Sequence, residues 1–386
     1  MAAPPRRVAV TGLGAVTPAG PDVASFREAL FAGVSLARPS SSHAYPVATV
    51  ADDAPRADLD PEAARLLGRC SRFAADAAIQ AALDARVPVR PETLPVMAVV
   101  IGSERGEEES LLRWTAATDP AERALWRRRA SLPPGTAVAR TLAAAGPCRT
   151  LTGDAAAGLA AVAEGADLIL RGEAAFVFCG GADAPLAGLA QEAADPSGGP
   201  SPASVAPGEG AVVFVLEELG LALQRGATVY AEMPGWSETF SRSPVATPSL
   251  HRVDASRALK AALMRGHTLQ SEVDAVFASA AALHGSGAEA FRLVWGRRAQ
   301  DTPVTAPDGV LGHLLAASGP ASMLAALLAM GAGAVPPAPG FEAARGARDV
   351  ATGRRELPLR RVVVNAFGPG HNVSIVLAAH DSAERM

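Results

Sequence analysis

The chain has 386 residues, of which 49% are hydrophobic, and a formal net charge of −4 at pH 7. This length is enough for one large folded unit or two fused halves, and the hydrophobic fraction excludes a disordered chain. Nearly all positive charges are arginines scattered along the sequence, so no basic stripe predicts a nucleic-acid partner.

The cysteines and the apolar segments bear on the compartment. Cys70, Cys148 and Cys179 have no metal-ligand spacing and cannot all pair, which favours a reducing cytoplasm and predicts no metal site. Residues 1–7 resemble no secretory signal. The stretch 313–335 is long enough to span a membrane, but it contains Gly, Pro and Ser throughout. We therefore predict a buried core helix there and no membrane association.

Strands and helices alternate along the first half, which is typical of an α/β fold. The hydrophobic periodicity predicts strands over 6–14, 96–104 and 211–218, and amphipathic helices over 24–33 and 71–85. The Pro-, Ser- and Gly-rich stretch 195–210 predicts a long surface loop.

The two halves of the sequence repeat one pattern. An apolar helix begins near Ala155, ends at Arg171–Gly172, and leads into a strand over 174–181. A similar helix begins near His313 and ends at 331–333, and a strand over 360–370 follows. Helices that are apolar on every side must both be buried. We predict two duplicated halves, 1–235 and 236–386, in one compact unit with these helices side by side. An ordinary layered α/β core is the alternative.

The turn before the first apolar helix is where an enzyme would place a nucleophile. The positive end of a helix activates a Cys or Ser in that position. Here the turn offers only Asp154, Ala155, Ala156 and Ala157. None of these side chains is the Cys or Ser nucleophile that such a turn would present.

Five segments together resemble the ketosynthases (β-ketoacyl-ACP synthases) of the thiolase fold. They are VAVTGLGAVTPAG (8–20), GPCRTLTGDAAAG (146–158), PGEGAVVFVLEE (207–218), GHLLAASG (312–319) and NAFGPGHN (365–372). The resemblance implies two βαβαβαββ halves that form a layered α-β-α-β-α core.

The resemblance also implies which positions should carry catalysis. Ketosynthases use a Cys nucleophile, two His and a Lys to load an acyl chain and condense it with a malonyl unit. In the matching register, Ala155 replaces the Cys, Ser279 the first His and Asp308 the Lys, while the second His is retained as His313. No intact catalytic set is therefore expected.

Nearby polar residues offer few substitutes. We expect Cys148 to be a small core residue, His284 a solvated loop residue and His371 a turn residue. Asp154 either caps the helix or, if the register shifts by one, occupies the nucleophile position. His313, at the expected helix start, either donates a hydrogen bond to substrate or is a retained structural residue.

One branch of the family fits these losses: the chain-length factor of type II polyketide synthases. Residues 273–296 and 302–315 resemble that branch. The resemblance implies a non-catalytic subunit that forms a heterodimer with an active ketosynthase and shapes the acyl tunnel. It implies no cofactor of its own, because substrates are carried on the phosphopantetheinyl acyl carrier protein. This chain departs from the branch in having Ala155, where Gln is frequent.

The resemblance also points to a gate and an interface. Leu111, Leu112 and Trp114, in a helix expected over 107–117, are candidate tunnel stops, although such spacing also fits ordinary core. The strand 174–181 and the turn before Ala155 are expected to form the interface. Arg127 to Arg129 would either meet an acidic carrier protein or form an exposed helix face.

Two alternative functions stay open at this point. One is a self-contained acyltransferase or malonyl decarboxylase that uses His313. The other is a purely structural homodimer.

Overall fold

The structure is a computed structural model. It describes residues 6–51, 59–88, 92–93, 96–194, 205–244, 246, 248–341 and 349–380. Most of the expected surface loop, residues 195–204, lies outside this range.

The first half contains five strands and nine helices within the described residues. They are β1 (Val8–Val16), α1 (Val23–Ala32), α2 (Pro61–Leu66), α3 (Arg69–Ala85), β2 (Met97–Ser103), α4 (Glu108–Ala116), α5 (Pro120–Ala130), α6 (Pro134–Thr141), β3 (Cys148–Thr152), α7 (Ala157–Arg171), β4 (Phe176–Asp183), α8 (Leu186–Ala194), β5 (Gly210–Glu218) and α9 (Leu219–Gln224).

The second half begins with β6, and the boundary that we placed at residue 235 lies inside this strand. Its α-helices and strands are β6 (Ala231–Phe240), α10 (Arg252–Arg265), β7 (Ala275–Ala278), α11 (Gly285–Trp295), β8 (Pro303–Thr305), α12 (Asp308–Leu311), α13 (Ser318–Ala332), β9 (Ala334–Val335), β10 (Asp349–Val350), β11 (Arg355–Glu356), β12 (Arg361–Phe367) and β13 (His371–Ala378).

Local signals in the sequence account for the helix ends. Asp22 caps α1 by accepting a hydrogen bond from the Ser25 amide. Gly172 and Gly333 end α7 and α13 with φ values of 72° and 59°, the left-handed conformation that glycine adopts without strain. The expected start of the second apolar helix is wrong: α13 begins at Ser318, because Leu315 has a φ of +50° and interrupts the helix.

The two halves have the same sheet topology. Within one continuous order of eleven hydrogen-bonded strands, the first sheet has the order β3-β2-β4-β5-β1, and the second has the order β8-β7-β12-β13-β6 with β10 added beside β8. In both sheets the first three strands pair in parallel and the last two antiparallel. A short β1–β6 pairing joins the sheets. The predicted duplication of βαβαβαββ units is thus confirmed.

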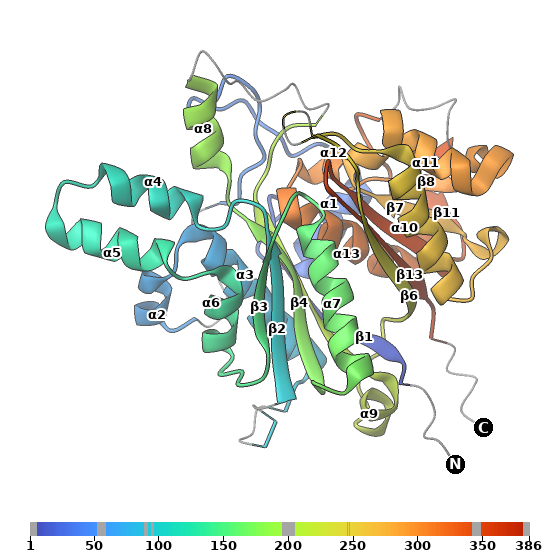
Figure 1. Ribbon diagram of the computed structural model, residues 1–386, viewed down its shortest axis with the longest axis horizontal. Helices are drawn as coiled ribbons and strands as arrows, with labels where there is room; N and C mark the ends of the chain where they lie inside the picture. Colours follow the sequence, from blue (N-terminus) through green and yellow to red (C-terminus); the bar gives the residue numbers. More distant parts are fainter. Residues whose placement is uncertain are drawn as a thin grey trace.

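Helices and sheets form five layers (Figure 1). Helices α3 and α6 pack on the outer face of the first sheet, and α10 packs on the outer face of the second, with α11 against it. Helices α7 and α13 contact each other and fill the layer between the sheets. Because α7 is buried almost throughout, its N-terminus is held at a fixed place between the halves.

The apolar segment near His313 is a core element. Residues Leu315–Ala332 are long and apolar enough to cross a membrane, but 72% of them are buried inside the protein. Helix α13 within this segment packs against β12, β7 and α7. The prediction of a buried core helix is confirmed.

The free sheet edge differs from our expectation. Strand β4 lies between β5 and β2, so residues 174–181 have no free edge, and the prediction that they form an edge-paired interface is wrong. The edge strand is β3, which pairs only with β2 among the described strands. Cys148 lies on β3 and is exposed, which also corrects its assignment to the core.

Glycines bring the two halves into direct backbone contact. A Cβ atom on Gly158 of α7 would lie 2.0 Å from the carbonyl oxygen of Ala316, and one on Gly181 of β4 would lie 2.3 Å from the same oxygen. A Cβ atom on Gly102 of β2 would lie 2.2 Å from the carbonyl oxygen of Ala157. These contacts seat α7 and the turn before α13 against the first sheet.

Replacing one of these glycines tests the packing. We expect Gly158→Ala to lower the free energy of unfolding by about 1–3 kcal/mol, because the added methyl group meets backbone that cannot move aside. Gly331→Ala, in α13, is the matched control, because its methyl group would meet no atom within 4 Å. The free energy of unfolding of the control should rise by up to about 1 kcal/mol. Urea unfolding of both variants measures the difference, and equal effects would contradict the packing argument.

Candidate functional site

The residues matched to the ketosynthase site gather around the N-terminus of α7. Ala155 lies in the turn just before α7 and is partly buried. The close contact between Gly158 and Ala316 brings the segment that follows His313 to the first turn of α7. The site is therefore shared between the two halves.

Ser279 and Asp308 hold backbone groups in place. Ser279, just after β7, is buried, and its Oγ accepts a hydrogen bond from the Phe367 amide at 3.3 Å. Asp308 begins α12 and is also buried. Its carboxylate accepts hydrogen bonds from the Ala280 amide at 2.5 Å and from Ser318 Oγ at 2.7 Å. Both side chains connect the second sheet to neighbouring turns.

His313 has acidic neighbours. It lies five residues before α13, and its side chain is 23% exposed. Its Nδ1 lies 3.2 Å from Ser318 Oγ and 3.7 Å from Asp308 Oδ1. Burial lowers the pKa of His313, but the Asp308, Glu104 and Asp183 carboxylates outweigh burial, so the net shift is upward. The imidazole is thus held in place by the same Asp308–Ser318 pair.

Asp183 is the buried polar centre of the site, and the sequence analysis missed it. It ends β4 and accepts four hydrogen bonds, from Ser103 Oγ (2.8 Å) and from the amides of Glu104 (3.0 Å), Arg105 (2.9 Å) and Ala316 (3.0 Å). Burial raises the pKa of Asp183, and the hydrogen bonds oppose that rise. A lone Asp after Gly180–Gly181, at the end of an apolar strand, was the available signal.

Glu104 adds a second carboxyl group to the site. It follows β2, is partly buried, and its Oε2 has no hydrogen-bond partner among the described residues. Burial and the nearby Asp183 charge raise the pKa of Glu104 to about 7, although His313 lowers it. Glu104 therefore loses its proton near neutral pH and not in the acid range.

Asp154 links α7 to the turn between β12 and β13. Its Oδ1 accepts a hydrogen bond from the Ala156 amide at 3.0 Å, and its Oδ2 accepts from the amides of Gly370 (2.7 Å) and His371 (2.8 Å). Burial alone would raise the pKa of Asp154, but these bonds and His371 lower it overall. Asp154 raises the pKa of His371 in return. The N-cap residue of α7 is Ala156, so Asp154 does not stand at the cap position itself, but its carboxylate binds the amide of that cap residue.

Three carboxyl groups thus act on the His313 imidazole, namely Asp308, Glu104 and Asp183. A fourth, Asp154, acts on Glu104. An additional negative charge placed among these groups would be repelled by those carboxyl groups that are ionised.

The described residues offer no substitute nucleophile in this site. Cys70 and Cys179 are buried, and burial raises the pKa of both thiols. Cys148 lies on the exposed sheet edge. His284 is exposed at the start of α11 and stacks on Phe341, as expected for a solvated residue. No group of three potential metal ligands occurs in the described part of the chain.

The candidate gate lies outside this site. Helix α4 and helix α5 project from one side of the molecule (Figure 1). Leu111 is 47% exposed, and Leu112 and Trp114 are partly buried. Trp114 lines a groove of about 580 Å³ together with Arg127, Arg128 and Arg140. Leu111, Leu112 and Trp114 would line an enclosed tunnel only if another subunit covered them.

The unusual pKa of Glu104 predicts a pH-dependent stability. The pKa of Glu104 is about 7 in the folded protein and about 4.3 in the unfolded chain. The protein therefore loses folding stability as the pH rises from about 4.3 to about 7. Glu104→Gln should therefore match the wild type near pH 4.5 and exceed it by about 1–2 kcal/mol at pH 8, after allowance for partial exposure.

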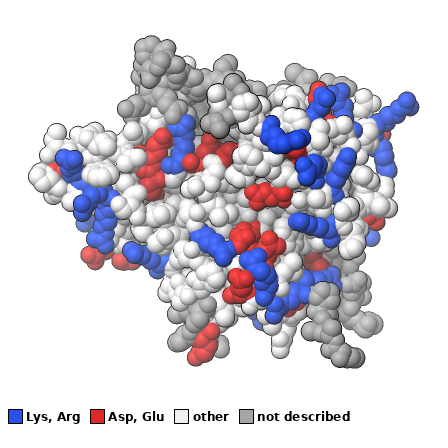
Figure 2. Space-filling view, viewed as in Figure 1, with Lys and Arg blue, Asp and Glu red and all other residues white. Residues whose placement is uncertain are grey.

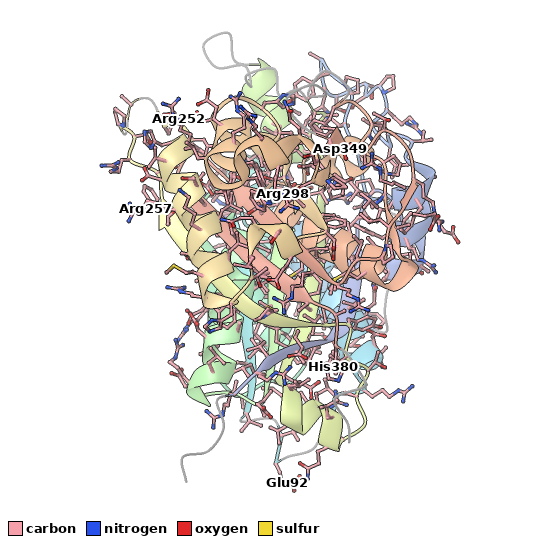
Figure 3. All side chains as sticks on the ribbon, turned by 90° about the vertical axis from the view of Figure 1, so that its right-hand side faces the viewer. Glu92, Arg252, Arg257, Arg298, Asp349 and His380 are labelled. Carbon is pink, nitrogen blue, oxygen red and sulfur yellow. The ribbon has the colours of Figure 1, made fainter. Side chains whose placement is uncertain are left out.

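Urea unfolding of the Glu104→Gln variant at both pH values measures this difference. Glu92→Gln is the control, because Glu92 is exposed at the lower end of the molecule in Figure 3. A pH-independent difference for Glu104→Gln would contradict the assignment.

Comparison with known proteins identifies the family. The profile of the β-ketoacyl synthase N-terminal domain matches residues 5–222, and that of the C-terminal domain matches residues 230–342. The chain is 32% identical to a polyketide β-ketoacyl synthase 2 of Streptomyces halstedii, over 97% of both chains.

Two solved structures have the same architecture. The ishigamide ketosynthase/chain length factor is similar with a TM-score of 0.81 and 27% identity, over 98% of this chain and 100% of that one. A type II polyketide synthase acyl-carrier protein in complex with its ketosynthase, bound to the hexaketide, is similar with a TM-score of 0.79 and 23% identity, again over 98% of this chain and 100% of that one. This protein belongs to the β-ketoacyl synthase family, and its relatives include ketosynthases of type II polyketide synthases.

Proposed function

We propose that this protein is a non-catalytic, chain-length-factor-like subunit. It pairs with an active ketosynthase and shapes the acyl tunnel while a type II polyketide or polyene chain grows on an acyl carrier protein. The observation that carries the proposal is a complete ketosynthase fold in which Ala155 stands at the nucleophile position. The proposed place of work is the cytoplasm, and no cofactor of its own is required.

The contacts of the site support a structural role. Asp154, Asp183 and Asp308 each accept hydrogen bonds from backbone amides of segments far apart in the chain or on different elements. A carboxylate satisfied in this way is committed to holding backbone and is a poor proton carrier. The polar groups of the pocket therefore support its shape more than they support chemistry.

A surface trough beside α7 supports the proposal that a second subunit binds there. A trough of about 800 Å³ runs beside α7 and is lined by Thr152 on β3, by Ala157, Ala160 and Ala163 on α7, and by Trp236 on β6. In the second sheet the equivalent strand β8 is covered by β10. An open strand edge beside a small-residue helix face is a ready site for edge pairing.

Charges around the trough are mixed in sign. Arg149 and Arg171 both pair with Glu164 of α7. Figure 2 shows blue and red side chains intermixed on this face, and blue side chains over α4 and α5. Mixed charges favour a partner surface of complementary pattern over a nucleic acid or an anionic membrane.

Co-expression with the cognate ketosynthase tests the heterodimer. Size-exclusion chromatography should yield a mixed complex, and Thr152→Arg should weaken it at least tenfold, because the new charged side chain would have to be buried at the strand edge. Thr228→Arg is the control, since Thr228 is also exposed but follows α9 at the other side of the first sheet. Recovery of two separate homodimers would refute the proposal.

The alternative function, a decarboxylase that uses His313, has one supporting observation. His313 is retained, and its pKa is raised. Incubation of the isolated protein with malonyl-carrier protein separates the two functions. Acetyl-carrier protein formed above the background of a His313→Ala variant would favour the decarboxylase.

The gate is tested in the complex with the ketosynthase. If the partner covers α4, Trp114→Ala should lengthen the products by at least one extension unit, because a large side chain is removed from the tunnel end. Trp126→Ala is the matched control, because Trp126 lies on α5 between Arg113 and Arg129. Product masses decide the matter, and unchanged lengths would exclude Trp114 as the gate.

A further inference from the structure

The Asp154 carboxylate lies where three backbone amides converge. The Ala156 amide belongs to the turn that begins α7, and the Gly370 and His371 amides belong to the turn between β12 and β13. The three donor-to-oxygen distances are 3.0, 2.7 and 2.8 Å. Two of these bonds join residues 216 and 217 positions apart. Such a set of amides, at a helix N-terminus, is a binding position for an anion.

The glycine turn is shaped around this carboxylate. A Cβ atom on Gly368 would lie 2.3 Å from Asp154 Cγ, and one on Gly370 would lie 3.1 Å from Oδ2. The turn can approach so closely only because both residues lack side chains. The approach also places the His371 ring next to Asp154, with Nδ1 3.7 Å from Oδ1.

The contacts of Asp154 lie next in sequence to the nucleophile position of the family. Asp154 directly precedes Ala155, which matches the nucleophile of the family, and Ala156, whose amide the Asp154 carboxylate binds, directly follows it. Backbone amides beside a nucleophile hold the negative oxygen that develops during acyl transfer. In this chain they are already satisfied.

We propose that Asp154 permanently occupies the anion-binding position at the N-terminus of α7. The chain's own carboxylate then closes this position to acyl groups, in addition to the absence of a thiol. The same contact locks the turn between β12 and β13 onto α7, so this wall of the pocket keeps one shape whether or not an acyl chain is near. The inference concerns this chain alone and does not depend on the heterodimer.

An anion-rescue experiment tests the occupancy. Asp154→Ala removes the carboxylate and should lower the melting temperature of the full chain by several degrees. Sodium formate, compared with sodium chloride at equal ionic strength, should restore part of this loss in a saturable way, because formate has the charge and shape of the missing group. In the wild type and in Asp154→Asn the side chain of residue 154 already fills the position between the three amides. The melting temperature of each should therefore be the same in the two salts. The absence of a formate effect on Asp154→Ala would overturn the proposal.

A thiol introduced at position 155 tests whether Asp154 closes this position to acyl groups. Ala155→Cys is placed in a Cys148→Ser background, because Cys148 is the exposed thiol. The protein is treated with acetyl-N-acetylcysteamine. The introduced thiolate attacks the thioester carbon, a new carbon–sulfur bond forms, and N-acetylcysteamine leaves as its thiolate. Adding Asp154→Ala should speed this acylation, followed by intact mass, at least tenfold.

Asp154→Asn separates occupancy from charge in the same assay. The amide fills the same space without the charge, so acylation should stay well below that of the Asp154→Ala protein. Equal rates with Asp, Asn and Ala at position 154, or equal rates with Asn and Ala, would overturn the proposal.

If Asp154→Ala does not fold, hydrogen exchange in the wild type decides. The Gly370 and His371 amides should exchange at least tenfold slower than the same amides in an unstructured peptide, and unprotected amides would overturn the inference. Failure of any of these tests would leave the proposed pairing with a ketosynthase untouched, because all of them use the isolated chain.

Discussion

The packing of α7 and α13 between two sheets is the constraint on which the rest of this structure depends. The carbonyl oxygen of Ala316 fits against Gly158 and Gly181, where no side chain could be accommodated. This contact fixes the turn that follows His313 against α7 and β4. The ends of β2 and β4, the start of α7 and the turn after β12 then meet at one place. A pocket shared by two halves exists only because the backbones approach this closely.

Carboxylates hold that junction together at the positions that match the ketosynthase site. Asp183 connects the ends of β2 and β4 with Ala316, and Asp308 connects Ala280 with Ser318. Asp154 connects α7 with the turn before β13. A buried carboxylate is tolerated when several donors satisfy it, and an unpaired one is not. Glu104, which lacks such donors on Oε2, is correspondingly the group whose pKa rises to about 7.

The two sheets share one topology but differ at their edges. Strand β10 pairs with the outer edge of β8, whereas no described strand pairs with the outer edge of β3, which lies beside a trough lined by small side chains of α7. An exposed strand edge beside small side chains is a ready place for a partner strand to pair. This asymmetry between the duplicated halves supports a second subunit, and it is independent of the residue at position 155.

The sequence by itself determined the element types, the duplication and the absence of a nucleophile at Ala155. These features follow from local periodicity, from glycines at helix ends and from residue identity at one position, all of which are readable along the chain. Family resemblance also predicted that Ser279 and Asp308 stand at two positions of one site, and in the structure Asp308 accepts a hydrogen bond from the amide of Ala280, the residue after Ser279.

Only the tertiary structure decided which edge is free, where Cys148 points, that α13 begins after Leu315, and that Asp154 binds amides 216 and 217 residues away. The physical reason is that strand order, solvent exposure and long-range hydrogen bonds depend on how distant segments pack. Neighbours in the sequence carry no record of that packing.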